Sequence, residues 1–227
     1  MSKSEIYIII PVYNEAAIIA QTLHQLLQTE YNIVVVDDGS SDGSGQVIKE
    51  FPVHYICHPV NIGQGAALQT GMDFAKMKNA LAVVHFDADG QHRVDDIAQV
   101  LSPVLNDECD VVFGSRFLQK NDASIPFSKK IFLQLARYVN WLFAGILLTD
   151  AHNGLRALNK KALNTIYFSE NKMAHASEIL WLIKDNHLTY KEVPVTIEYT
   201  AYSRRKGQSL WNAINIIFDL LFKKINR

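Results

Sequence analysis

Short apolar runs alternate with longer amphipathic stretches along the first half of the chain. Five runs are apolar, often β-branched and bounded by turn residues, as is typical of buried strands; they span residues 6–10, 33–36, 54–57, 82–86 and 111–113. Apolar residues recur at helical spacing between them, at residues 16–29, 43–51, 63–77 and 94–105. This alternation predicts an α/β fold in which helices cover both faces of a mostly parallel sheet.

Composition adds a few constraints. The chain has 227 residues, of which 48% are apolar, so it can bury a sizeable core, and we expect one large domain. A net charge of −1 gives no overall basic field, so nucleic acid is not an expected partner. Cys57 and Cys109 do not make a disulfide framework, and the first predicted strand leaves no room for a signal peptide before it, so we expect a cytosolic protein.

Acidic side chains follow three of the predicted strands. The segments are Pro-Val-Tyr-Asn-Glu at 11–15, Asp-Asp-Gly-Ser at 37–40 and Asp-Ala-Asp-Gly-Gln at 87–91. Open α/β sheets bind ligands beyond the carboxyl ends of their parallel strands, so the three segments are expected to meet at one site. Converging carboxylates repel one another unless they share a cation, so this arrangement predicts a divalent metal that holds a phosphorylated ligand.

In this order, the three segments resemble the family 2 glycosyltransferases, which have the GT-A fold with a Rossmann-like sheet and use nucleotide-sugar donors. Within that family the chain is most similar to the dolichol-phosphate and polyprenyl-phosphate sugar synthases. The resemblance extends from residue 6 to residue 210, and we predict a GT-A domain over residues 1–210. It implies an enzyme with a nucleotide diphosphate sugar as donor and a polyprenyl phosphate lipid as acceptor.

The resemblance also implies which residues bind the donor. The matching positions are Pro11, Tyr13, Glu15, Val36, Asp38, Asp87, Ala88, Gln91 and Arg204. Asp38 matches an aspartate that contacts the nucleotide base, whereas Asp37 is expected to be structural. Arg204 matches the arginine of a loop that closes over the donor phosphates, but the lysine that the family has later in this loop is replaced by Leu210. Either Arg205 or Lys206 supplies that charge, or the donor phosphates are held differently.

A metal site is expected at the third acidic segment. At the end of a strand, Asp87 and Asp89 point to the same side, and two aligned carboxylates suit Mg²⁺ or Mn²⁺ bound mainly through diphosphate oxygens and water. The resemblance implies that Asp89 is a direct ligand, that Asp87 is a ligand or contacts the ribose, and that Gln91 adds a neutral oxygen. The nearby His85 and His92 are expected to be hydrogen-bonded and not metal-bound.

The Asn-Ile-Gly-Gln-Gly segment at residues 61–65 has the appearance of a phosphate-binding loop. It lacks the Lys-Ser/Thr pair of a P-loop and the third glycine of a dinucleotide fingerprint, so neither assignment holds. Two interpretations stay open: a helix N-terminus that approaches the nucleotide closely, or glycines that permit tight helix packing.

Two further segments are candidates for the reaction centre. Arg116 matches a family arginine that approaches the phosphates, and an arginine fork can hold two phosphate oxygens; surface solvation is the alternative. Asp150 is a catalytic-site candidate, together with Asp89 and Arg116. Arg156 is expected to pair internally and brace the loop that follows Asp150. A phosphate acceptor is already an anion and needs little deprotonation, so Asp150 is expected to position the metal or acceptor and not to act as a base.

The acceptor side is suggested by two apolar segments with basic neighbours. Residues 131–148 are interrupted by polar residues and preceded by Lys129 and Lys130, which favours a helix in the membrane interface over a span; a buried core helix is the alternative. The resemblance implies that Lys129 contacts the acceptor phosphate. Residues 211–227 predict a second amphipathic helix at the membrane. We therefore expect a peripheral enzyme on the cytosolic face, with a separate membrane subunit as a candidate partner.

The predicted function is a metal-dependent, inverting transfer of one sugar from a UDP- or GDP-linked donor to polyprenyl phosphate. A transferase that acts on a glycan hydroxyl during polysaccharide assembly is the alternative within the same fold. A non-catalytic nucleotide-sugar-binding subunit is the alternative from another class, and the presence of Asp89, Arg116 and Asp150 argues against it. The sequence does not identify the sugar or the base.

Overall fold

The computed structural model describes residues 3–118, 145–150 and 153–198. Within these residues one sheet contains seven strands: β1 (Ile6–Val12), β2 (Asn32–Asp37), β3 (His54–Cys57), β4 (Ala82–His85), β5 (Val111–Ser115), β6 (Arg156–Asn159) and β7 (Tyr190–Pro194). The described α-helices are α1 (Ile19–Leu26), α2 (Ser44–Ile48), α3 (Gln64–Met77), α4 (Asp96–Leu105), α6 (Lys160–Thr165) and α7 (His175–Asp185). Short 3₁₀ segments are η1 (Lys3–Glu5), η2 (Leu27–Thr29) and η3 (Arg116–Leu118).

The strands lie in the order β3-β2-β1-β4-β6-β5-β7. β6 runs antiparallel to both of its neighbours, β4 and β5, and the other described pairs are parallel. The predicted α/β fold with a mostly parallel sheet is therefore confirmed. Because β2, β1 and β4 are adjacent and parallel, the segments that follow them leave the sheet at the same edge.

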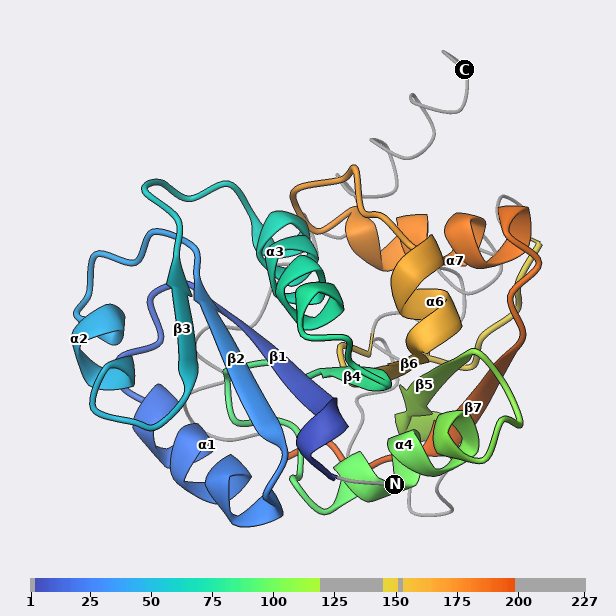
Figure 1. Cartoon of the computed structure of the whole chain (residues 1–227), viewed down its shortest axis with the longest axis horizontal. Helices are drawn as coiled ribbons and strands as arrows, with labels where there is room; N and C mark the ends of the chain where they lie inside the picture. The colour runs from blue at the N-terminus through green and yellow to red at the C-terminus, as the bar shows by residue number, and fades with distance from the viewer. Residues whose placement is uncertain (1–2, 119–144, 151–152, 199–227) are drawn as a thin grey trace.

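Helices cover both faces of the sheet (Figure 1). α3, α6 and α7 pack on one face and share a core cluster with strand residues such as Ile9 and Val34. α1, α2 and α4 pack on the other face against residues such as Ile8 and Val35. All seven residues of β1 are buried, because successive side chains of a central parallel strand point into one core and then the other.

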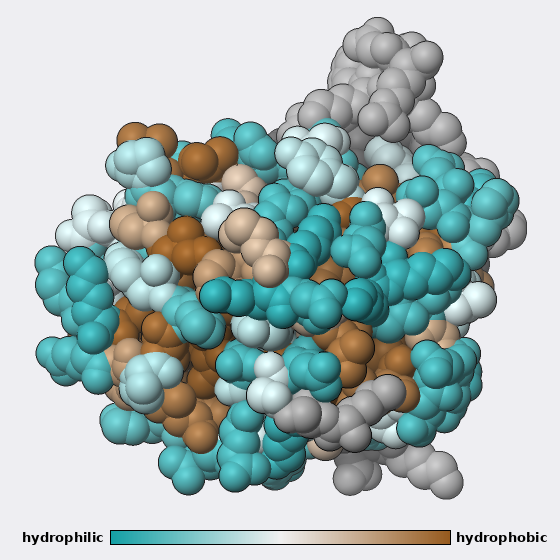
Figure 2. Space-filling model, in the orientation of Figure 1, coloured by the Kyte–Doolittle hydropathy of each residue, from teal (hydrophilic) through white to brown (hydrophobic). Residues whose placement is uncertain are grey.

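The surface is mixed on the face that Figure 2 displays. Hydrophobic side chains there occupy separate areas between hydrophilic ones and do not form one continuous band (Figure 2). Within residues 3–118, 145–150 and 153–198, no helix has the length and apolar character needed to cross a membrane.

The five predicted strands and four predicted helices are all present; the strand at 54–57 has the predicted ends, and the others are shifted at one end or both. α1 begins at Ile19 and not at residue 16, because the carbonyl of Glu15 accepts hydrogen bonds from the backbone of Ile18 and Ile19 and forms a separate turn first. The prediction missed β6, α6, α7 and β7, which complete the sheet and one of its helical layers.

Several predictions fall outside the described residues. Lys129, Arg204 and the predicted helix at 211–227 are among them. The predicted interfacial helix at 131–148 overlaps the described chain only at its last four residues, which are not helical, and Ile146 and Leu148 are buried in the core there. The single domain over residues 1–210 stays a prediction.

Candidate active site

The three acidic segments meet at one edge of the sheet. Val12, at the end of β1, is in register with Asp37, and its carbonyl accepts a 2.8 Å hydrogen bond from the backbone of Asp38. On the other side of β1, the backbone of Phe86 donates to the carbonyl of Ile9. The segments that begin at Asp38 and at residue 87 therefore flank the end of β1, as the sequence predicted.

The turn after β1 is fastened to the turn after β2. The backbone of Asn14 donates to Ser40 Oγ over 2.9 Å, and the backbone of Glu15 donates to Ser44 Oγ over 2.8 Å. Asn14 has a φ of 55°, a left-handed conformation that asparagine tolerates better than most residues. These bonds fix the turn that follows β1.

The predicted donor-binding residues of β1 and β2 differ in their exposure. Pro11 and Val36 are register partners, and both are buried. Glu15 is 8% exposed, whereas Tyr13 is 46% exposed. Of these four side chains, Tyr13 is the one that a ligand in solution reaches directly.

Asp37 and Asp38 both hold loops in place. Asp37 accepts from the backbone of Ser40 and from the hydroxyl of Tyr55, at 2.9 and 3.0 Å, in agreement with the structural role expected for it. Asp38 is 2% exposed and accepts from the backbone of Ile62 and Gly63 at 3.0 and 2.7 Å. Its carboxylate thus fastens the end of β2 to the loop that enters α3.

A histidine adds a third contact to Asp38. Nδ1 of His58 lies 2.8 Å from Asp38 Oδ1, and its Nε2 lies 2.9 Å from the hydroxyl of Thr70 in α3. His58 is therefore held at both ring nitrogens, between the end of β3 and α3. The sequence did not indicate this Asp38–His58–Thr70 chain, which includes the residue predicted to contact the base.

The glycines at the start of α3 permit tight packing. A Cβ atom at Gly63 would overlap the carbonyl of Asn171, and one at Gly65 would overlap the carbonyl of Glu170. The carbonyl of Asn171 also accepts a hydrogen bond from the backbone of Ala66. The start of this helix is covered by protein backbone, so the packing interpretation of the segment is the one that the structure supports.

The carboxylate of Asp87 is held on two sides. Its Oδ1 accepts a 2.9 Å hydrogen bond from Nε2 of Gln64, and its Oδ2 lies 3.2 Å from Nε2 of His92. Burial opposes ionisation, but the hydrogen bond and charge of His92 and the charge of Arg156 keep the pKa of Asp87 below its ordinary value. A Cβ at Gly154 would overlap this carboxylate, so a larger residue there would displace the Asp87 side chain.

Asp89 and Gln91 are hydrogen-bonded to each other. The backbone of Gln91 donates to Asp89 Oδ1 over 3.1 Å, and its side-chain amide donates to Oδ2 over 2.5 Å. Burial, and after it the charge of Asp87, raises the pKa of Asp89. Ala88, between the two aspartates, is buried, and its carbonyl accepts a hydrogen bond from the Thr22 hydroxyl, which anchors the turn to α1.

These residues fit a divalent cation. Asp87 and Asp89 would supply carboxylate oxygens whose negative charges oppose each other, and Gln91 would supply a neutral amide oxygen, which is the type of ligand set that Mg²⁺ or Mn²⁺ prefers. In the described part of the chain, no group of three or more His, Cys, Asp or Glu side chains is arranged to hold a metal. A cation here would therefore take most of its remaining ligands from a bound diphosphate and water.

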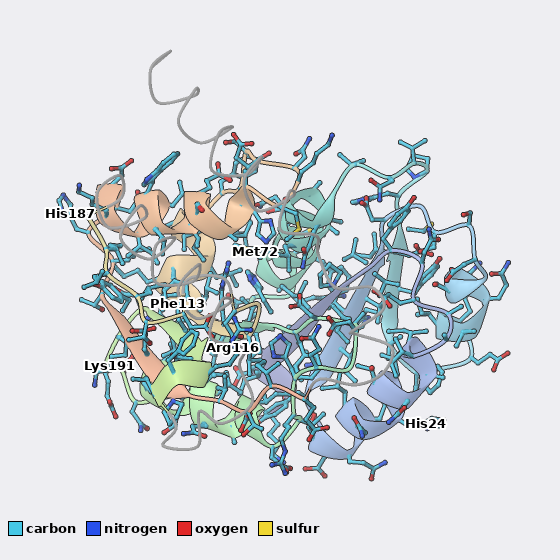
Figure 3. All side chains as sticks on the ribbon, turned by 180° about the vertical axis from the view of Figure 1, so that it is seen from behind. His24, Met72, Phe113, Arg116, His187 and Lys191 are labelled. Carbon is cyan, nitrogen blue, oxygen red and sulfur yellow. The ribbon has the colours of Figure 1, made fainter. Side chains whose placement is uncertain are left out.

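Arg116 and Asp150 form a bidentate ion pair on the far side of β4. Nε and Nη2 of Arg116 lie 2.7 and 2.8 Å from the two carboxylate oxygens, and the Arg116 backbone donates to the same carboxylate over 3.1 Å. Asp150 is 2% exposed; burial opposes its ionisation, but Arg116 keeps its pKa below the ordinary value. Arg116, near the middle of the molecule in Figure 3, is therefore not a solvated surface residue, and two of its fork nitrogens bind Asp150.

Arg156 lies in the core beneath these carboxylates. It is 2% exposed, its Nε donates to the carbonyl of Asn153 over 3.1 Å, and its guanidinium stacks 5.6 Å from the ring centre of Phe113. Burial lowers its pKa to about 10, while Asp87 and Asp150 act in the opposite direction. Its bond to Asn153 agrees with the expectation that it braces this loop.

Two buried histidines share this region. Burial, and after it the charge of Arg156, lowers the pKa of His85 to about 3 and that of His175 to about 4. Both rings are therefore neutral near pH 7. His92 is hydrogen-bonded through Nε2 to Asp87, as expected. The same expectation is wrong for His85, because neither of its buried ring nitrogens has a hydrogen-bond partner among the described residues.

The described chain ends at Glu198, beside the candidate metal-site residues. The backbone of Glu198 donates to the carbonyl of Gln91 over 2.8 Å, and Ile197 forms a β-bridge with His92. The basic segment that includes Arg204 follows six residues later in the sequence and lies outside the described residues, as does Lys129.

Comparison with known proteins identifies the family. The model of the family described as glycosyl transferase family 2 matches residues 7–167. The chain belongs to glycosyl transferase family 2. The resemblance stated from the acidic segments is therefore confirmed, and the protein is a glycosyltransferase.

Relatives of this glycosyltransferase cover nearly its whole length. It is 35% identical over 248 residues to a UDP-N-acetylglucosamine–dolichyl-phosphate N-acetylglucosaminyltransferase of Methanococcus voltae, with 100% of this chain and 99% of the relative covered. It is 27% identical over 223 residues to the polyprenol monophosphomannose synthase of Mycolicibacterium smegmatis, with 92% of this chain and 82% of the relative covered.

A solved structure confirms the fold. The glycosyltransferase superposes on glucosyl-3-phosphoglycerate synthase from Mycobacterium tuberculosis, in complex with Mn²⁺, uridine diphosphate and glucosyl-3-phosphoglycerate, with a TM-score of 0.73. Sequence identity is 16%, and the match covers 95% of this chain and 77% of that one. At this identity the likeness concerns the fold alone, and the predicted GT-A fold is confirmed.

Sequence reasoning placed the acidic residues of this glycosyltransferase correctly at one edge but missed the side chains that hold them. These are Gln64 at Asp87, His58 at Asp38 and Glu192 near Asp150. Gln64 comes from the start of a predicted helix, His58 comes from a segment between predicted elements, and Glu192 comes from a strand that was not predicted. The one available signal was the Gly-Gln-Gly segment at residues 63–65, whose central residue points into the site.

Proposed function

We propose that this glycosyltransferase transfers one sugar, with inversion, from a nucleotide diphosphate sugar to a polyprenyl phosphate. Support comes from the names of two relatives: one specifies dolichyl phosphate, and the other specifies the synthesis of polyprenol monophosphomannose. A third relative, from Micrococcus luteus, is named undecaprenyl-phosphate mannosyltransferase and is 30% identical over 166 residues. The three differ in the sugar that they carry, so the proposal does not commit to one sugar or base.

The Arg116–Asp150 pair is the observation that favours a phosphate acceptor over a sugar hydroxyl. A hydroxyl acceptor needs a general base, and a base needs a free oxygen and a pKa near neutral pH. Asp150 has both oxygens bonded to Arg116 and a lowered pKa, so it is a poor proton acceptor. A phosphate monoester, whose second pKa is about 6, is already an anion near pH 7 and attacks without a base.

We propose that Arg116 faces the phosphates at the reaction centre. Asp150 fixes the plane of its guanidinium, so the charge is oriented before substrates arrive. Attack of the acceptor oxygen on the anomeric carbon expels the nucleotide diphosphate, and negative charge grows on the departing diphosphate oxygen. A preformed cation at that point lowers the barrier because it needs no reorganisation.

The donor is proposed to lie across the ends of β2, β1 and β4. Tyr13 is accessible for contact with the nucleoside, and Asp38 lies beneath the position expected for the base, with Pro11, Glu15, Val36 and Ala88 forming the buried floor. Asp87, Asp89 and Gln91 would hold Mg²⁺ or Mn²⁺, which supplies positive charge to the diphosphate when bound. Arg204 and Lys129 are proposed to contact donor and acceptor phosphates.

Membrane association is part of the proposal because the acceptor is a lipid. The segments at 131–148 and 211–227 are proposed to lie at the cytosolic membrane surface, with a separate membrane subunit as a possible partner. Recovery of the whole protein in the soluble fraction of cells at low salt would contradict this part.

The test measures release of nucleotide diphosphate from a panel of UDP- and GDP-sugars with Mn²⁺ or Mg²⁺ in detergent. Polyprenyl phosphate and the neutral polyprenol of equal chain length form the matched pair of acceptors. We expect release with one donor, and only with the phosphorylated lipid. Release with glycans but not with the lipid phosphate would indicate the polysaccharide alternative, and donor binding without any release would indicate a non-catalytic subunit.

A further inference from the structure

Glu192 binds the two residues that lead into Asp150. It lies on β7 in register with Phe113 of β5. Its Oε1 accepts from the backbone and the hydroxyl of Thr149, at 2.8 and 2.7 Å, and from the backbone of Asp150 at 3.2 Å. Its Oε2 lies 3.0 Å from the Thr149 nitrogen. One carboxylate therefore receives two consecutive backbone N–H groups just where the Asp150 side chain begins.

The same carboxylate reaches Arg116 through a chain of hydroxyls. The hydroxyl oxygens of Thr149 and Ser115 are 2.6 Å apart, and Ser115 Oγ accepts from the backbone of Phe117 over 3.2 Å. An ionised carboxylate only accepts, so Thr149 must donate to Glu192 and Ser115 must donate to Thr149. Each hydroxyl in this chain therefore donates in one defined direction. The chain holds Ser115 and Phe117, the residues on both sides of Arg116.

The neighbouring residue on β7 has a different environment. Lys191 forms an ion pair with Glu108 over 2.7 Å, and both side chains are about half exposed, at 49% and 44%. Figure 3 shows Lys191 at the outer edge of the sheet and Arg116 near the middle. Glu192 and Lys191 thus share one strand, but only Glu192 contacts the segment that carries Asp150.

We infer that Glu192 is a positioning residue for the transfer reaction: it holds Thr149 and Ser115 so that Asp150 orients Arg116. This inference rests on the proposed function, in which Arg116 faces the phosphates. The donor edge at β1, β2 and β4 has no described hydrogen bond to Glu192, so donor binding is expected to be independent of it.

The first experiment compares steady-state kinetics of Glu192→Ala, Glu192→Gln and Lys191→Ala. Glu192→Ala removes every contact to Thr149, and kcat is expected to fall between about 10-fold and about 100-fold, with less than about a twofold change in donor KM. Glu192→Gln keeps one oxygen for the Oε1 contacts and is expected to lie between wild type and the alanine variant. Lys191→Ala is expected to match wild type. Unchanged kcat in Glu192→Ala, or an equal loss in donor affinity, would overturn the inference.

A double-variant cycle separates positioning from a general structural effect. If Glu192 acts through Asp150, adding Glu192→Ala to Asp150→Ala lowers kcat no further. If the two losses multiply, Glu192 acts by another route and the inference is wrong. Matching urea midpoints for Glu192→Gln and wild type ensure that the comparison is made on folded protein.

A measurement without substrates keeps the inference separate from the proposed function. The Arg116 Nε proton, bonded to Asp150, is expected to exchange slowly with water in the full chain, as observed by nitrogen-15 NMR. Glu192→Ala is expected to accelerate this exchange at least about 10-fold, and Lys191→Ala to leave it unchanged. If wild type releases no nucleotide with the lipid phosphate, the proposed function fails, while this exchange still decides whether Glu192 positions Arg116. Unchanged exchange in Glu192→Ala would refute the positioning role.

Discussion

The donor edge of the sheet and the Arg116–Asp150 side of the site are built differently. At the donor edge, acidic side chains follow directly on parallel strands, and Asp38 is held chiefly by backbone N–H groups of the loop after β3. On the other side, Arg116 and Asp150 are 34 residues apart in the sequence and bind each other. Glu192 lies 43 residues beyond Thr149, binds that threonine, and so supports the Arg116–Asp150 pair. One region depends on strand order, and the other depends on paired side chains.

This difference determines which changes each region tolerates. Backbone donors in a loop stay in place when one side chain is shortened, so the donor edge is expected to lose affinity in small steps. A bidentate ion pair has no substitute when one partner changes shape, and the remaining charge is left buried without its partner. The reaction side is therefore expected to lose turnover sharply. The proposed metal-site residues lie at the donor edge, but changing them is expected to lower turnover as well as donor affinity.

The largest effect is expected at Asp89. Asp89→Ala removes the proposed direct metal ligand, and kcat is expected to fall about 1000-fold, because charge on the departing diphosphate loses its main stabilisation. The measurement is nucleotide release over a range of Mn²⁺ concentrations. Asp95→Ala, at an exposed carboxylate of the following turn, is the control. A folded Asp89→Ala protein with unchanged metal affinity and turnover would eliminate the metal assignment.

A smaller but still large loss is expected from Arg116→Lys. Lysine keeps the charge but cannot bind both oxygens of Asp150, so kcat is expected to fall about 100-fold while donor KM changes little. Arg93→Lys alters an exposed arginine, 46% accessible at its side chain, and is expected to behave as wild type. Equal losses in kcat and in donor affinity would show that Arg116 serves the donor edge instead.

The same contrast explains what the sequence could predict. β1 to β4 consist of short apolar runs between turn residues, so the mostly parallel sheet and the meeting of the acidic segments followed from the pattern. β6 has four residues with Arg156 and Asn159 at its ends, and β7 opens with Tyr-Lys-Glu, so neither has the apolar character of a core strand. Asn159 does give a local signal for α6, because its side chain accepts from the backbone of Ala162.

Pairing between distant side chains had no such signal. The Arg116 fork was expected to hold phosphates, and Asp150 was expected to position metal or acceptor, but nothing in their spacing indicates that they bind each other. The same holds for Gln64 and Asp87, which are 23 residues apart on different elements. Sequence alone specifies the residue types of this site, whereas the packing of α3 beside β4 and the pairing of β5 with β6 and with β7 determine which of them meet.

A moderate effect is expected at the donor edge from His58→Phe. The ring loses both polar contacts, to Asp38 and to Thr70, and the carboxylate loses one of its three partners. The two backbone donors remain, so donor KM is expected to rise by about 10-fold, the cost of one buried hydrogen bond, with little change in kcat. Thr70→Val removes only the far contact and is expected to have a smaller effect. A fall in kcat without a change in KM would contradict the division between the two regions.

The smallest effect on activity is expected from Asp110→Asn, which tests the scaffold of the reaction side apart from its chemistry. Burial opposes ionisation of Asp110, but bonds from Thr189, Lys161 and Asn159 lower its pKa to about 2. Since this folded-state pKa lies below the ordinary 3.8, the stabilisation is present above pH 3.8 and disappears as the pH falls toward 2. In urea unfolding, the free energy of unfolding of wild type should therefore exceed that of Asp110→Asn by about 2 kcal/mol at pH 7 and by much less near pH 2. The kcat at pH 7 is expected to be unchanged. A loss of kcat with no loss of stability would mean that the strand junction at Asp110 shapes the reaction site directly.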